Sequence, residues 1–138
     1  MVKKPLAEYA PLVLRLGMAG VFAWFGASQL MGTHQWTSMV PEWAMGMSGL
    51  SASTIVRLNG GFEILATLPL VVGVWTRWVA LVLFVHLLVI ASDIGMTPIG
   101  VRDLGLCVAT LAIALYGDDQ WCLTYRKQSS VGVDTSKA

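Results

Sequence analysis

Four long apolar blocks run along the chain, separated by polar or Gly- and Pro-containing connections. The blocks are residues 10–31, 55–75, 78–94 and 99–117. Each has about 17–22 residues, enough to cross a bilayer as a helix that rises about 1.5 Å per residue. The pattern therefore predicts an all-α fold, an integral membrane four-helix bundle. We expect one membrane domain at residues 1–126 and a flexible cytoplasmic tail at residues 127–138.

The positions of lysine and arginine predict the orientation. Arg15 lies inside the first block, which is longer than the apolar region of a signal peptide, so we expect a retained helix. Basic residues precede the first block, follow the fourth, and occur at Arg77 between the second and third, whereas the other two connections contain none. Because loops rich in Lys and Arg stay in the cytoplasm, both termini are predicted to be cytoplasmic in a bacterial inner membrane.

Composition agrees with a membrane protein. The chain is 56% hydrophobic and only 12% charged, whereas an ordinary soluble domain has about 25% charged residues. The net charge is +1 and no basic stripe is present, so nucleic-acid binding has no support. Cys107 and Cys122 lack metal-ligand spacing, and we expect them to pack as small hydrophobic residues without a metal site.

Three further patterns bear on packing. The connection at residues 32–54 is too apolar for a simple solvated loop, so we expect an interfacial or re-entrant segment broken at Pro41. Tryptophans near the block ends suit the headgroup region. Small residues recur at helix-packing spacing, and we expect them to hold the helices together. They are Ala19, Ala23 and Ala27 in the first block and Gly105 and Ala109 in the fourth.

Charged residues inside the apolar blocks mark the candidate site, because a lone charge near mid-bilayer costs at least about 2.5–3.5 kcal/mol and normally faces a partner or a cavity. In the predicted topology, all such charges except Arg15 lie in the outer half of the bundle. We expect a polar pocket there, in which Glu63 pairs with Arg57 or Arg102. Its candidate residues are Gln29, Arg57, Asn59, Glu63, His86, Asp93, Arg102 and Asp103.

A purely structural role competes with this hypothesis. Arg57, Asp93, Arg102 and Asp103 are close enough to block ends to reach the headgroups or to cap helices. Glu63 lies deeper, which favours a functional pocket, whereas a single His86 is more often a hydrogen-bonded core residue. No residue pattern supports a catalytic triad, a phosphate loop or haem ligation, so no catalytic residue is assigned.

Several motifs resemble those of DoxX-type small membrane proteins. The stretch LRLGMAGVFAWFGASQL contains Arg15, NGGFEILATLPLVVGVWTRW contains Glu63 and the Thr76–Arg77 turn, and GVRDLGL contains the Arg102–Asp103 pair. The resemblance implies a four-helix inner-membrane protein. It also implies a link to quinone-reducing or quinol-oxidising enzymes, for which several members of the family are named.

The leading hypothesis is a non-redox membrane subunit, or an anchor, of a quinone-linked oxidoreductase complex. Under it, Glu63, Arg102 and His86 contact a quinone headgroup or move protons, with Trp24 or Trp36 against the ring. No covalently bound cofactor is expected. The expected partners are the lipid bilayer and redox subunits, with a second copy of the chain as a further candidate. The alternative is a non-catalytic scaffold or assembly protein whose intramembrane charges are structural.

Overall fold

The computed structural model describes residues 6–125, which form helices joined by short connections. The long helices are α1 (Ala10–Met31), α4 (Ala52–Val72), α5 (Thr76–Ile94) and α6 (Pro98–Tyr116). The short elements are η1 (Leu6–Tyr9), α2 (Thr33–Trp36), η2 (Thr37–Met39) and α3 (Glu42–Ser48). All four long helices are long and apolar enough to cross a membrane, so the predicted all-α four-helix membrane fold is confirmed. The expected tail at residues 127–138 lies outside the described residues.

Local capping explains why α4 begins and ends earlier than the apolar pattern predicts. The Ser51 side chain accepts a hydrogen bond from the Thr54 N–H (3.3 Å), which caps the first turn. Gly73 ends the helix with a left-handed φ of 75°, a conformation that glycine adopts without strain. The Thr97 side chain caps α6 in the same way, accepting from the Gly100 N–H (3.1 Å).

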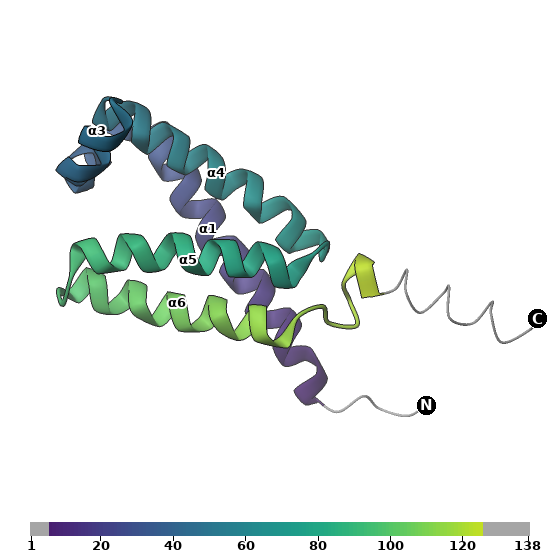
Figure 1. Ribbon diagram of the computed structural model, residues 1–138. Helices are drawn as coiled ribbons and strands as arrows, with labels where there is room; N and C mark the ends of the chain where they lie inside the picture. The colour runs from purple at the N-terminus through teal and green to yellow at the C-terminus, as the bar shows by residue number, and fades with distance from the viewer. Residues whose placement is uncertain (1–5, 126–138) are drawn as a thin grey trace, which may run out of the picture.

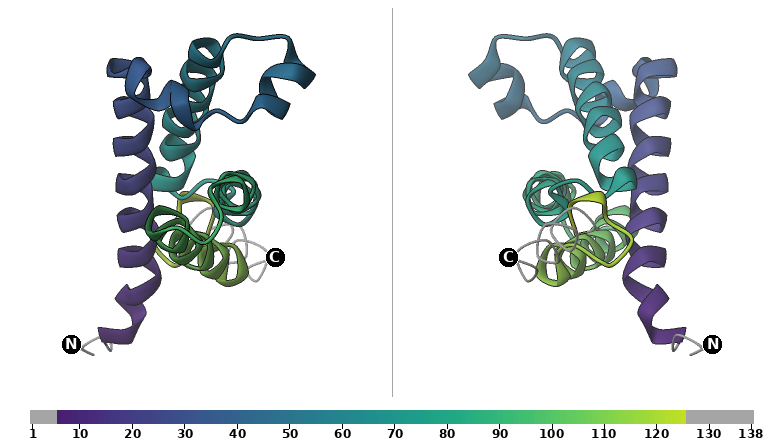
Figure 2. Two further views of the ribbon diagram at one scale, coloured as in Figure 1. Left: turned by 90° about the vertical axis from the view of Figure 1, so that its left-hand side faces the viewer. Right: turned by 90° about the vertical axis from the view of Figure 1, so that its right-hand side faces the viewer.

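The long helices form two antiparallel pairs. α1 packs chiefly against α4 and α5 against α6, while smaller contacts join α1 to α6 and α4 to α5 (Figure 1). Figure 2 shows α5 and α6 nearly end-on where α1 and α4 run vertically, so the two pairs cross steeply. The bundle therefore consists of two crossed pairs and not of four near-parallel helices.

The connection between α1 and α4 is itself helical. α2 and η2 precede Pro41, and α3 follows it, so the chain breaks at the proline as expected. The proline cannot donate a backbone hydrogen bond, and its extended conformation (ψ 146°) redirects the chain before α3 begins. The segment extends from the α1–α4 pair at the end where α1 finishes (Figure 2).

Glycines bring α1 and α4 close together. A Cβ atom on Gly26 would lie 2.7 Å from the Gly60 carbonyl oxygen, and one on Gly60 would lie 2.8 Å from the Gly26 oxygen. Both distances are too short for any other residue.

Among the predicted packing residues, Ala19 is buried, but Gly105 is exposed with no atom near its missing side chain. The prediction for Gly105 is therefore wrong, because this position faces away from the other helices.

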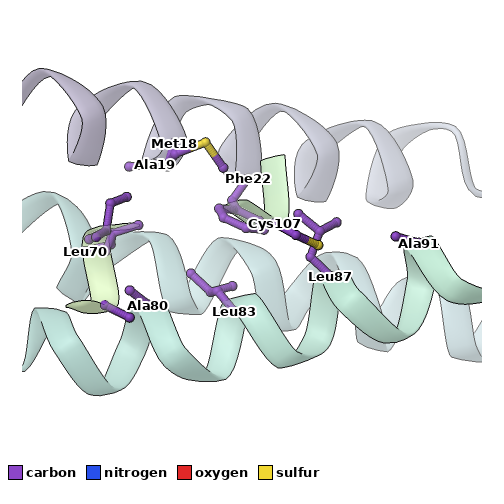
Figure 3. Close-up of a cluster of buried hydrophobic side chains, with 11 residues drawn as sticks. Met18, Ala19, Phe22, Leu70, Ala80, Leu83, Leu87, Ala91 and Cys107 are labelled. Carbon is purple, nitrogen blue, oxygen red and sulfur yellow. The ribbon is translucent and has the colours of Figure 1, made fainter. Parts of the chain in front are cut away.

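The apolar core lies where the two pairs cross. Phe22 of α1 and Leu83 and Leu87 of α5 converge there, with Leu70 of α4 nearby (Figure 3). Cys107 of α6 belongs to the same cluster, and Cys122 is fully buried outside it, so both cysteines pack as expected. The core separates two polar regions, one at each end of the molecule.

Candidate functional site

A cavity of about 220 Å³ lies between the four long helices, at the end where α1 finishes and α4 and α6 begin. We call this the cavity end. The segment from Trp36 to Pro41 forms part of its wall. Most of the wall is apolar: Val21, Phe22, Phe25, Trp36, Met39, Val40, Pro41, Ile55, Val56, Leu87, Ile90, Ile94, Ile99 and Leu106. An apolar cavity of about 150 Å³ can bind benzene, so this one has room for a single substituted ring.

Six of the eight candidate residues line this cavity. They are Gln29, Asn59, Glu63, Asp93, Arg102 and Asp103. Arg57 is exposed and His86 is partly buried, and neither lines the wall. Trp36 does so, whereas Trp24 is 64% exposed on α1 and lies outside the cavity. Of the two tryptophans considered for a ring contact, only Trp36 is in a position to make one.

A buried network of amides surrounds the Glu63 carboxylate. Its Oε2 accepts from Gln29 Nε2 (3.3 Å) and its Oε1 from Asn59 Nδ2 (3.2 Å). Asn59 Nδ2 also donates to Gln29 Oε1 (2.8 Å). His86 Nε2 lies 3.4 Å from Glu63 Oε1, with its ring against Phe62. Glu63 therefore touches both the cavity and His86.

The predicted pairing of Glu63 with Arg57 or Arg102 is wrong. Arg57 precedes Glu63 by six positions, so the two side chains point about 120° apart around α4. Arg102 instead pairs with the adjacent Asp103, whose Oδ1 accepts from both Nε and Nη2 at 2.8 Å. Asn59 shares a helix face with Glu63, and the Gly26–Gly60 contact brings Gln29 within reach, so amides take the place of the expected cation.

Phe25 brings two nitrogen donors together in the wall. The Arg102 guanidinium lies over its ring, 5.2 Å from the centroid, and the Trp36 indole meets it edge-on at 5.8 Å. The Trp36 Nε1 atom is buried and has no hydrogen-bond partner among residues 6–125. Sequence reasoning assigned this indole to the headgroup region or to a ring contact, and it missed the unpaired N–H and the role of Phe25.

Asp93 joins the helical connection to α5. Its Oδ1 accepts from Trp43 Nε1 of α3 (2.9 Å), and both side chains are exposed. This contact holds α3 near the end of α5, next to the cavity wall. Asp93 is thus a tether for the connection as well as a lining residue.

A second polar cluster lies at the opposite end, where the segment after α6 packs against η1 and the start of α1. Arg15 donates through Nε to Asp119 Oδ2 (2.8 Å) and through Nη1 to the carbonyls of Leu70 (2.6 Å) and Val71 (2.8 Å) in the last turn of α4. Arg15 is 2% exposed and Asp119 3%. Sequence reasoning missed Asp119 because it considered only the charges inside the apolar blocks, and Asp119 follows the fourth block. In the predicted topology Asp119 follows the fourth block on the same side as Arg15, and that signal could have identified it.

The segment after α6 folds back over the α4–α5 turn. Asp118 Oδ1 accepts from the Thr76 N–H (3.1 Å), and Thr124 donates through its backbone N–H to the Gly73 carbonyl (3.2 Å). Cys122 is fully buried beside Gly73, and its sulfur lies 3.3 Å from the Thr76 hydroxyl. Burial raises the pKa of the Cys122 thiol, and the Thr76 contact opposes this in part. The thiol therefore stays protonated and inert near neutral pH.

The comparison with curated proteins returned no significant match, and neither did the comparison with solved structures. The DoxX family model matches residues 10–96. Arg102 and Asp103 lie beyond this match, although they line the cavity. The matched range is more than half of the chain and runs from the start of α1 through α5, including the buried Glu63 network, so the chain belongs to the DoxX family.

Proposed function

We propose that this protein is a membrane subunit of a quinone-linked oxidoreductase complex and that its cavity binds the headgroup of a lipid-soluble quinone. The observation that carries the proposal is a ring-sized, mainly apolar cavity with a buried carboxylate in its wall, inside a set of membrane-spanning helices. The apolar wall suits the faces of a ring, and the few polar groups suit its oxygens.

Proton transfer is the chemistry that the Glu63 network would supply. Reduction of a quinone to a quinol takes up two electrons and two protons. Glu63 lines the cavity and its Oε1 lies 3.4 Å from His86 Nε2, so the carboxyl group can exchange a proton with a ring oxygen and regain one from the imidazole. The electrons would come from a redox partner subunit.

The proposal includes a location. Basic residues flank the first and fourth blocks and mark the turn at Arg77, whereas the connections at the cavity end contain none. By the positive-inside rule the cavity then lies in the outer half of a bacterial plasma membrane. A quinone would reach it laterally from the lipid.

One observation favours the alternative of a non-catalytic scaffold. Each Glu63 oxygen already accepts hydrogen bonds from Gln29 or Asn59, and a fully satisfied polar network can fix the register of helices without binding anything. The two functions predict different effects of removing the Glu63 charge. A quinone site would lose activity per molecule of folded protein, whereas a scaffold would lose only the amount of assembled protein.

The test is Glu63→Gln, which keeps the shape of the side chain, removes the titrating carboxyl and replaces one of its two acceptor oxygens with an NH2 donor. We expect quinone-linked turnover in membranes, normalised to the amount of protein, to fall about tenfold or more, since contacts to a charged group contribute about 1.5–3 kcal/mol. Binding of a short-chain benzoquinone by the purified protein is measured alongside. Glu42→Gln is the matched control, because Glu42 is exposed on α3 and does not line the cavity.

Two outcomes would contradict the proposal. If Glu63→Gln matches the wild type in both turnover and binding, Glu63 has no part in quinone chemistry. If the variant lowers the amount of assembled protein but leaves the quinone handling of each molecule unchanged, the scaffold alternative is correct.

A further inference from the structure

The cavity wall contains a second polar region, which is distant in sequence from the Glu63 network. It supplies hydrogen-bond donors, whereas the Glu63 carboxylate supplies acceptors. The Glu63 carboxylate is an acceptor, whereas Trp36 and Arg102 present only donors. Both residues line the cavity and both contact Phe25. The wall therefore has an acceptor region on α4 and a donor region shared by α2 and α6.

The donor region is incomplete within the described part of the chain. The Trp36 indole N–H is buried without an acceptor. Buried polar groups almost always have a partner, so an unpaired donor in a cavity wall requires an explanation. Asp103, the nearest carboxylate in sequence to Arg102, is already bonded to that guanidinium through two nitrogens.

Arg102 adds charge to the donor region. Asp103 Oδ1 holds its Nε and Nη2 atoms at 2.8 Å, which fixes one edge of the guanidinium, and its central carbon lies over the Phe25 ring, 5.2 Å from the centroid. A guanidinium has five N–H donors, so others remain to bind an oxygen. The side chain is half exposed, which leaves room for a ligand atom.

We propose that Trp36 and Arg102 form a subsite for an oxygen acceptor of the bound ring, separate from the Glu63 network. This inference rests on the proposed function and adds to it the orientation of the ring. One carbonyl oxygen of the quinone accepts from Trp36 and Arg102, and the second oxygen lies at Glu63, where a proton must lie between the two oxygens for them to bond. A hydrocarbon ring can form a hydrogen bond neither at Glu63 nor at the Trp36–Arg102 subsite.

The experiment uses the full chain in lipid nanodiscs with ¹⁵N-labelled indoles. The probes are a short-chain benzoquinone and an alkylbenzene with the same tail. Trp36→Phe identifies the Trp36 indole signal, and in the wild type we expect that signal to shift on addition of the quinone but not of the alkylbenzene. We expect Trp36→Phe to weaken quinone binding about two- to tenfold, the effect of one hydrogen bond, and to leave alkylbenzene binding unchanged.

Trp78→Phe is the matched control. Trp78 is 66% exposed at the start of α5, at the opposite end from the cavity, so its replacement should change neither affinity. Once the signal has been identified, its shift is measured on the wild type, so this readout tests the subsite without relying on the affinity of any variant.

The inference is overturned if the wild type binds quinone in a Glu63-dependent way while the Trp36 signal stays in place and Trp36→Phe binds equally well. In that case the proposed function survives without the subsite. If the wild type binds no quinone at all, the proposed function fails and the subsite fails with it.

Discussion

At the scale of single residues, the Arg15–Asp119 pair is the most deeply buried salt bridge among residues 6–125. Both side chains are almost completely buried, and Arg15 also binds two carbonyls in the last turn of α4. Those carbonyls lack intrahelical partners, and the negative end of the helix dipole attracts a cation there. The pair therefore ties together α1, the end of α4 and the segment after α6.

Asp119→Asn should destabilise the protein by about 3–5 kcal/mol, because it leaves the Arg15 charge buried without its counter-charge. SDS-induced unfolding in mixed micelles measures this. Asp118→Asn is the control: Asp118 is only partly buried and accepts from the Thr76 N–H, which an asparagine oxygen can still do, so we expect a loss below about 1.5 kcal/mol. Equal losses of stability in the two variants would show that the Arg15–Asp119 pair contributes no more to stability than the Asp118 hydrogen bond.

At the scale of elements, the distance between α1 and α4 decides the geometry of the Glu63 network. Gly26 and Gly60 pack backbone to backbone, and Gln29 lies one turn further along α1, within hydrogen-bonding reach of Glu63. A wider separation would remove that hydrogen bond. The glycines thus contribute to the site although they touch no ligand.

Gly60→Ala should destabilise the protein by about 1–3 kcal/mol, because the new methyl group meets the Gly26 carbonyl and forces the helices apart. The adjacent Gly61 has no neighbouring atom within 4 Å of its missing side chain. Gly61→Ala should therefore be neutral or stabilise by up to about 1 kcal/mol through helix propensity. The same unfolding titration compares the two, and a Gly61→Ala loss as large as that of Gly60→Ala would contradict the close-packing account.

At the scale of the whole molecule, polar chemistry is divided between the two ends. The cavity end has the Glu63 network and the Trp36–Arg102 donors, and the other end has the Arg15–Asp119 pair and the segment after α6. The apolar core at the crossing of the helix pairs separates them. Because only the second end has basic residues in its connections, the two ends should face different compartments.

Labelling with a membrane-impermeant maleimide tests this orientation. In spheroplasts, Ser48→Cys on α3 should react at once, whereas Ala7→Cys in η1 should react only after permeabilisation, since both positions are exposed at opposite ends. The wild type is the control, because Cys107 and Cys122 are buried and should not react. The reverse pattern of labelling would put the cavity in the cytoplasmic half.

Much of this protein follows from the chain alone. Apolar length determines four membrane-spanning helices, because lipid offers backbone groups no partner and each span must satisfy them internally. The cost of charge in lipid likewise identifies the residues that need partners, so Gln29, Asn59 and Glu63 can be selected by depth and helix face before any fold is known.

The partners of those residues are decided only by the tertiary structure. Glu63 meets two amides and a histidine instead of an arginine, Arg102 turns to its neighbour Asp103, and Arg15 reaches Asp119, which is 104 positions away. Periodicity gives the face of each helix, but partner choice depends on how the helices rotate and cross. Here the glycine contact between α1 and α4 and the steep crossing of the two pairs determine that arrangement.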